Sequence, residues 1–236
     1  MKLLLCGDIC PTAKNEALFA NGDVNALFGN VAALFSGNDL NFANLECALT
    51  DGGEPIVKKG PNLRSGTATA ATLKALGLDV CGLSNNHVFD FGIEGIADML
   101  AALKVQGIAY TGFGKDYDDA RRDFVFEKNG ERVTLITVCE HEYSYATEDG
   151  MGSRPFDEFD TLEDVRAARA AGGTVVVLYH GGKEFCRQGK EPLRKDLQGP
   201  LFPQAGKRSS QEVTQASLLQ GTTGLSVPGR SGCQSV

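Results

Sequence analysis

The segment Leu83–Ile96, which reads LSNNHVFDFGIEGI, constrains the fold and the chemistry of this chain more than any other. The apolar run over residues 76–83 predicts a buried strand, and the apolar spacing over residues 93–103 predicts a helix. The turn between them holds four polar residues, Asn85, Asn86, His87 and Asp90. Because α/β proteins bind ligands at the carboxyl ends of strands, this turn is a candidate site. The competing interpretation is structural, with asparagines that favour a turn and a histidine that caps the helix.

Composition and net charge exclude several classes of function for this chain. The chain has 236 residues, a net charge of −7 and a pI of about 5.0, which argues against nucleic acid as a partner. The apolar run at residues 1–6 is short for a signal peptide, and no later run has the length of a membrane span. The seven cysteines include no CxxC pair, which favours reduced thiols. We therefore expect a soluble, cytoplasmic α/β protein, and the oligomeric state stays open.

Strand and helix patterns alternate along most of the chain. Strands are predicted at residues 2–6, 39–45, 76–83, 107–112 and 173–179, and helices at 67–76, 93–103, 116–122 and 162–171, with two short helices within 15–35. The strand at 39–45 alternates polar and apolar residues, so we expect it to be half-buried. Asn129-Gly130 predicts a hairpin over residues 124–138. A hairpin requires antiparallel pairing, so the sheet structure cannot be purely parallel.

The composition changes near residue 187. Residues 188–236 are rich in Gln, Ser, Gly and Pro and lack sustained periodicity. Such a segment is typical of disorder, or of translated sequence foreign to the domain. We therefore predict a folded domain at residues 1–187 and a low-complexity tail, disordered or non-native, at 188–236.

Four predicted strands end in side chains that bind metals. These residues are Asp8, Glu46, Asn86 and His180. Carboxylate, amide and imidazole groups suit Mn, Fe, Zn or Mg, as one ion or as two that share a carboxylate. His87, beside a ligand, would protonate a leaving group. The structural alternatives are that Asp8 caps a helix and that His180 is a hydrogen-bonded core residue.

Several motifs in this order resemble one family. They are Gly7-Asp8, Asn44-Leu-Glu46, the basic loop 58–64, Ser84-Asn-Asn-His-Val-Phe-Asp-Phe-Gly92, the hairpin and His180-Gly-Gly-Lys-Glu184. Together they resemble the CapA-type capsule-synthesis proteins, which are associated with poly-γ-glutamate and belong to the calcineurin-like metallophosphoesterase superfamily. The resemblance implies a four-layer α/β/β/α sandwich of two mixed sheets with divalent metal, Mn, Fe or Zn, at the strand ends. It implies Asp8, Glu46, Asn86 and His180 as ligands and His87 as the acid.

The sequence departs from the superfamily pattern at two places. Cys10 stands where the superfamily has a histidine in its first motif. The late Gly-His-Xaa-His motif has no counterpart, because the three histidines are His87, His141 and His180. We therefore expect a C-terminally incomplete fold and a metal site with fewer ligands, which binds metal weakly or not at all.

The residues around the site have predicted supporting roles. Lys59, Asn62 and Arg64 form either a clamp for an anionic substrate or a solvated loop. Asn85, Asp90 and Glu184 are predicted to orient the ligands. The leading hypothesis is a metal-dependent hydrolase that acts on a phosphoester or a γ-glutamyl polymer. The alternatives are a non-catalytic capsule-assembly protein that binds polymer through a vestigial site, and an inactive truncated fragment.

Overall fold

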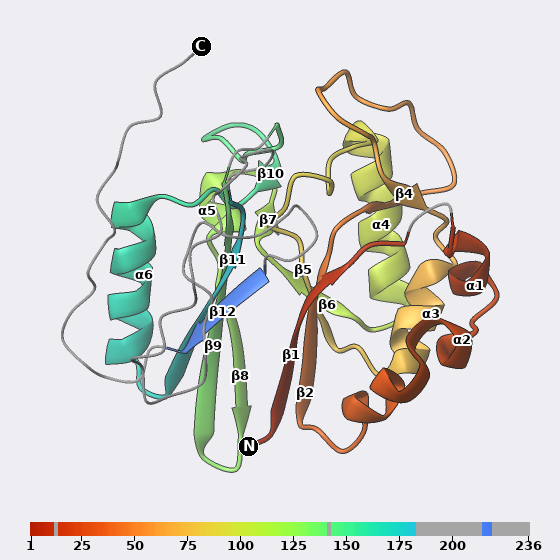
Figure 1. The fold of residues 1–236 in the computed structure, drawn as a ribbon. Coiled ribbons are helices and arrows are strands. Elements are labelled where there is room, and N and C mark those ends of the chain that lie inside the picture. Colours follow the sequence, from red (N-terminus) through yellow and green to blue (C-terminus); the bar gives the residue numbers. More distant parts are fainter. Residues whose placement is uncertain (12–13, 141–142, 183–213, 219–236) are drawn as a thin grey trace, which may run out of the picture.

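Four parallel strands form the first of two larger sheets. The computed structural model describes residues 1–11, 14–140, 143–182 and 214–218 (Figure 1). The first sheet has the order β1-β2-β5-β6 and contains β1 (Leu3–Ile9), β2 (Leu40–Leu45), β5 (Val80–Gly82) and β6 (Ala109–Thr111). All its pairings in the described residues are parallel, so the expectation that both sheets are mixed stays a prediction for this sheet. β1 extends beyond its predicted end at Cys6, and Asp8 therefore lies within the strand.

The second sheet is mixed and contains the predicted hairpin. Its order is β12-β11-β9-β8, and its strands are β8 (Phe124–Lys128), β9 (Glu131–Cys139), β11 (Thr174–His180) and β12 (Thr214–Leu218). β9 pairs parallel with β11, while β8 and β12 pair antiparallel with their neighbours. Asn129 and Gly130 have φ values of 54° and 79°, as a type I′ turn requires. The hairpin prediction is confirmed.

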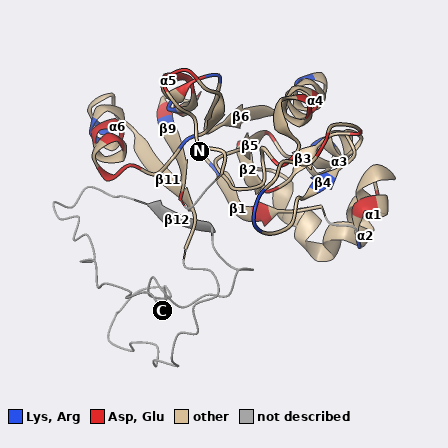
Figure 2. Ribbon diagram, turned by 90° about the horizontal axis from the view of Figure 1, so that it is seen from above, with Lys and Arg blue, Asp and Glu red and all other residues tan. Residues whose placement is uncertain are grey.

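The helices lie on the outer sides of the two sheets. α1 (Glu16–Ala20), α2 (Val24–Phe28), the 3-10 helix η1 (Gly29–Phe35), α3 (Thr69–Leu76) and α4 (Gly92–Val105) lie beside the first sheet, and α5 (Tyr117–Ala120) and α6 (Glu158–Ala170) lie towards the second. Figure 2 shows this division from above. Two short pairs, β3 (Ala48–Leu49) with β4 (Arg64–Ser65) and β7 (Phe113–Gly114) with β10 (Gly152–Ser153), complete the described strands.

Three buried clusters hold these layers together. One joins the first sheet to α1, α3 and α4 and includes Leu45, Leu73 and Met99. A second, with Phe42 and Leu135, fills the space between the two sheets. The third packs β9 and β11 against α6. Apolar burial on both faces of each sheet explains why the core strands are rich in Val, Ile and Leu.

The strand β2 is fully buried, which differs from the half-buried strand that its sequence predicts. Its polar residues Asn41 and Asn44 are only 4% exposed. The Asn41 amide donates hydrogen bonds to the carbonyl oxygens of Phe35 (3.0 Å) and Gly77 (2.7 Å). Polar side chains with hydrogen-bond partners can be buried without a large cost. The alternation of β2 therefore reflects buried hydrogen bonding and not exposure to water.

The predicted tail is described at one place. Residues 214–218 form β12, which pairs antiparallel with β11. The rest of residues 188–236 lies outside the described residues, and the division into a domain and a tail stays a prediction.

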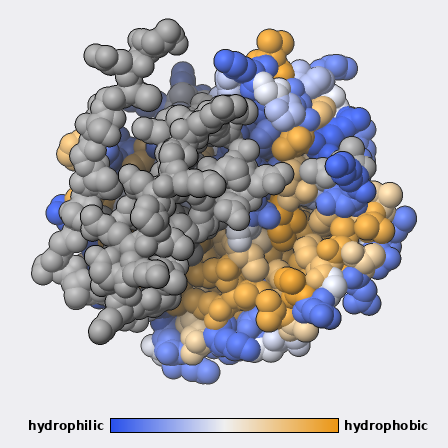
Figure 3. Space-filling model, in the orientation of Figure 1, coloured by the Kyte–Doolittle hydropathy of each residue, from blue (hydrophilic) through white to orange (hydrophobic). Residues whose placement is uncertain are grey.

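Apolar side chains gather on one face of the molecule, over β1 and η1 (Figure 3). In η1, the apolar residues Val31 and Leu34 are 51% and 59% exposed. Within the described part of the chain, no helix has both the length and the apolar character that crossing a bilayer requires. The predicted cytoplasmic location stays a prediction.

Replacing Gly130 by alanine is expected to lower the free energy of unfolding by about 1 kcal/mol, because the residue has a φ of 79° and an added Cβ meets only open space. Backbone strain is then the only cost. Urea unfolding measures the change. Asn129→Gly, which relieves the other positive φ, serves as the control and is expected not to destabilise the protein. An equally stable Gly130→Ala protein would contradict the type I′ turn.

Candidate metal centre

Two carboxylates and an imidazole meet where the two sheets adjoin. Asp8 comes from β1, Glu46 directly follows β2, and His180 ends β11. One ligand atom from each of these residues lies within 4.8 Å of the other two. The His180 Nδ1 is 3.4 Å from the Asp8 Oδ1, and its Nε2 is 3.6 Å from the Glu46 Oε1. Parallel strands end at a common edge, and this edge therefore collects side chains that are far apart in sequence.

Asn86 completes the set of predicted ligands. It lies in the turn after β5, and its Oδ1 is 3.2 Å from the His180 Nε2. The structure thus brings together all four side chains that their positions at strand ends predicted as metal ligands. Their role as ligands stays a prediction.

Asn44 belongs to the Asn44-Leu-Glu46 motif, but it was not among the predicted site residues. Its Nδ2 donates to the Asp8 Oδ1 (2.7 Å) and lies 3.3 Å from the His180 Nδ1. Asn85 in turn donates its amide to the Asn44 Oδ1 (3.1 Å) and to the Leu45 carbonyl oxygen (2.9 Å). Asn44 therefore orients two candidate ligands, and Asn85 orients Asn44. The available signal was that Asn44 stands two residues before Glu46 at the end of the same strand.

His87 is held by the turn and does not cap the following helix. The helix α4 is preceded by Phe91, with no side-chain cap, so the capping interpretation is wrong. The His87 Nδ1 is 2.7 Å from the Asp90 Oδ2, and its backbone N–H donates to the Asn85 Oδ1 (3.0 Å). A carboxylate only accepts hydrogen bonds, so the contact with Asp90 favours a hydrogen on Nδ1 and leaves Nε2 as the nitrogen for proton exchange. Both His87 and Asp90 are buried.

The basic loop divides into one buried and two exposed cations. Lys58 has a side chain that is only 2% exposed, and its ammonium group pairs with Asp90. Lys59 and Arg64 are exposed, and the Arg64 guanidinium lies 5.2 Å from the centroid of the Phe91 ring. Lys59 was predicted as a site residue and Lys58 was not, because nothing in two adjacent lysines of a loop shows which one is buried.

Asn62 contributes to the loop itself. Its amide donates to the carbonyl oxygens of Ile56 (3.1 Å) and Asp90 (3.0 Å). These bonds tie the loop to the turn that carries His87. Of the three predicted clamp residues, Lys59 and Arg64 are thus the ones with exposed side chains.

Cys10 lies near the carboxylates. Burial first, and then the negative charges of Glu46 and Asp8, raise the pKa of its thiol to about 12. The thiol is therefore neutral near pH 7 and adds no charge to the cluster. Glu184 and His141 lie outside the described residues.

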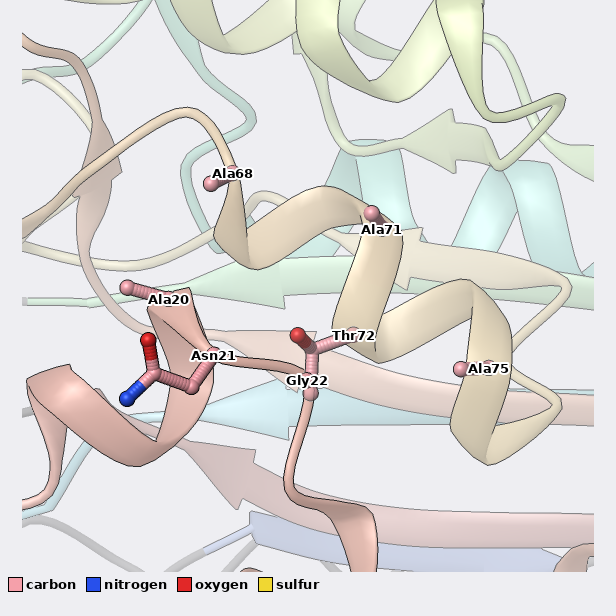
Figure 4. A pocket seen from close by; sticks show the side chains of 7 residues that line it. All are labelled: Ala20, Asn21, Gly22, Ala68, Ala71, Thr72 and Ala75. Carbon is pink, nitrogen blue, oxygen red and sulfur yellow. The ribbon is translucent and has the colours of Figure 1, made fainter.

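A hollow of about 370 Å³ on the outer helical layer has a different character (Figure 4). It lies between α1 and α3 and is lined by Ala20, Asn21, Gly22, Ala68, Ala71, Thr72 and Ala75. None of these lining residues titrates. This hollow therefore offers no general acid or base.

The donor set fits a divalent metal. Two carboxylates, an imidazole and an amide oxygen are donors that Mn, Fe and Zn accept in proteins. The side chains of Asp8, Glu46 and His180 are 23%, 21% and 12% exposed, so an ion could reach them from solvent. The fold and the site define a mixed α/β protein with a candidate metal-binding cluster at the ends of its strands.

The chain belongs to the bacterial capsule synthesis protein family PGA_cap, whose model matches residues 2–195. This finding confirms the resemblance drawn from the motifs.

Curated relatives carry related names. The chain is 33% identical over 177 residues to a probable polyglutamine synthesis accessory protein of Mycobacterium tuberculosis H37Rv, covering 70% of this chain and 45% of that protein. It is 25% identical over 185 residues to the PGA biosynthesis protein CapA of Bacillus subtilis 168, covering 76% and 48%. The chain therefore spans about half the length of these relatives.

Among solved structures, the NAD nucleotidase NadN of Haemophilus influenzae is similar to the chain with a TM-score of 0.47 and 18% identity. The similarity covers 78% of this chain and 34% of that one.

Proposed function

We propose that this chain is a metal-dependent hydrolase of the capsule family that acts on a phosphoester or on a γ-linked glutamyl polymer. The observation that carries the proposal is the meeting of Asp8, Glu46 and His180 within 4.8 Å, drawn from three strands of two sheets. Two carboxylates and an imidazole at this spacing are donors that a divalent ion accepts. A divalent ion held there would supply Lewis-acid polarisation of a phosphoryl or carbonyl oxygen.

Other residues of the chain would orient the ligands, transfer a proton and attract the substrate. Asn44 fixes the orientation of Asp8 and His180 through its amide. His87, held by Asp90 through Nδ1, would take up a proton from solvent at Nε2 and donate it to the leaving group. The exposed Lys59 and Arg64 would attract an anionic substrate to an otherwise acidic protein, while Asn62 holds the loop that carries them. This arrangement suits hydrolysis of an anionic ester.

We further propose that the complete fold is the four-layer α/β/β/α sandwich of the metallophosphoesterase type. Support comes from the cluster that joins the two sheets and from the two clusters that join each sheet to its helices. The purely parallel first sheet leaves β1 at an edge within the described residues. An additional antiparallel strand at this edge would make both sheets mixed.

A non-catalytic role in capsule assembly is the second candidate. Within the described residues the site offers Asp8, Glu46, Asn86 and His180 as candidate ligands, and a metal held by such a set could bind polymer or partners without turnover. Metal-dependent hydrolysis of bis(p-nitrophenyl) phosphate or of poly-γ-glutamate separates the two candidates. Turnover that requires manganese and is abolished by EDTA supports the enzyme, whereas bound metal without turnover of either substrate supports the assembly role.

Asp8→Asn is expected to weaken manganese binding by at least 10–100-fold, since changes to the surroundings of a metal site alone typically have effects of this size. The substitution keeps the size of the side chain and removes its charge. Elemental analysis and calorimetric titration of the purified protein measure the loss. Asp118→Asn, on an exposed position of α5, is the matched control. Equal metal content in all three proteins would show that Asp8 is not a ligand.

A further inference from the structure

We propose that Lys58 is a positioning residue that fixes the ring of His87 by anchoring Asp90. The inference rests on the proposed function, because it concerns the residue proposed to protonate the leaving group. Its starting observation is a buried cation: the Lys58 and Asp90 side chains are 2% and 0% exposed and form an ion pair. A lysine buried to this degree needs a partner.

The ammonium group of Lys58 contacts three parts of the same turn. Besides Asp90, it donates to the Asn86 carbonyl oxygen (3.1 Å) and lies 3.2 Å from the His87 Nδ1. The Asp90 Oδ2 is closer to that nitrogen, at 2.7 Å, and also accepts from the Leu63 backbone N–H (2.6 Å). The carboxylate is therefore held from two sides, by the loop backbone and by the lysine, and presents one oxygen to the imidazole.

This arrangement gives Lys58 a role that differs from substrate binding. The ammonium group of Lys58 pairs with Asp90, and the Lys58 side chain is shielded from solvent. The side chains of Lys59 and Arg64 are exposed. Without the ammonium group, Asp90 would be a buried carboxylate without its cation, and it would turn away from the imidazole. His87 would then lose the hydrogen bond that favours the Nδ1–H tautomer. The buried lysine thus links the basic loop to the orientation and tautomer of the His87 ring.

The test measures the ring directly and needs no turnover. Long-range ¹H–¹⁵N NMR correlations of metal-free protein report the tautomer of each imidazole, and three histidines are readily assigned through His141→Gln and His180→Gln. The wild-type protein is expected to show His87 as the Nδ1–H tautomer. Lys58→Met is expected to give mixed tautomers, whereas Lys59→Met, at the exposed neighbour, keeps the wild-type pattern. If Lys58→Met does not fold, Lys58→Gln is measured against the same criterion.

Steady-state kinetics provide the second readout. Lys58→Met is expected to lower kcat by about 10–100-fold, as changes to orienting partners typically do, without a change in KM. A raised KM with unchanged kcat would instead make Lys58 a substrate clamp and overturn the inference. So would a wild-type His87 spectrum in a folded Lys58→Met protein. If the wild-type protein has no activity, the proposed function fails, and the NMR result still decides the role of Lys58.

Discussion

Replacing His87 by alanine is expected to lower kcat for manganese-dependent phosphodiester hydrolysis by about 10²–10⁴-fold, the range of general acid–base catalysis. Manganese affinity is expected to stay unchanged. The reason is geometric: the His87 Nδ1 faces Asp90 at 2.7 Å and is not among the atoms that gather at the candidate metal cluster. Loss of turnover with retained metal would separate an acid from a ligand. Initial rates and calorimetric titration on the same preparation measure both quantities.

His141→Ala is the control for this prediction, since it removes a histidine that has no predicted role in the site. It is expected to leave kcat unchanged. A parallel loss of metal affinity in His87→Ala would make His87 a ligand, and unchanged kcat would favour the non-catalytic assembly role. Thermal unfolding of both variants checks that the turn is intact, because His87 is a buried residue.

The candidate ligands were predictable from the sequence because strand ends are predictable. Asp8, Glu46 and His180 each stand at or directly beyond an apolar run, and parallel strands bring such ends to one edge. The residues that hold them were harder to identify. Asn44 lies in a strand whose alternating polar positions predicted exposure to water, so its role in the site was not recognised. Lys58 was indistinguishable from Lys59, because burial depends on how an irregular loop folds back onto the turn.

Prediction of the fold was also limited by contacts between residues that are far apart in the sequence. Hydrophobic periodicity and the Asn129-Gly130 turn located the helices and the hairpin. Pairing across the sheets was not visible, because hydrogen-bond partners far apart in sequence leave no local pattern. β12 lies within a segment whose composition suggested disorder, and its pairing with β11 is a long-range contact of that kind. Sequence patterns therefore predict the individual helices and strands better than they predict how the strands pair into sheets.

Arg154 illustrates a long-range interaction that no local pattern reveals. The arginine is 2% exposed and follows β10. Its Nη1 donates to the Asp123 Oδ1 (2.9 Å) and to the Arg121 carbonyl oxygen (3.0 Å), and its Nη2 donates to the Asp164 Oδ2 (2.6 Å). The guanidinium group thereby joins α6 to the segment after α5. Burial raises the pKa of the Asp123 carboxyl, and the hydrogen bond from Arg154 opposes that effect.

Arg154→Met is expected to lower the free energy of unfolding by about 1–3 kcal/mol, because it leaves Asp123 without this cation, while Asp164 keeps its ion pair with Arg121. Urea unfolding monitored by circular dichroism measures the change. Arg166→Met removes an exposed arginine from α6 and is expected to change stability by less than about 0.5 kcal/mol. Arg154→Lys keeps a charge but loses the planar fork that reaches two carboxylates, so it should fall between these variants. A loss in Arg154→Met no larger than that in Arg166→Met would mean that apolar packing alone holds α6 in place.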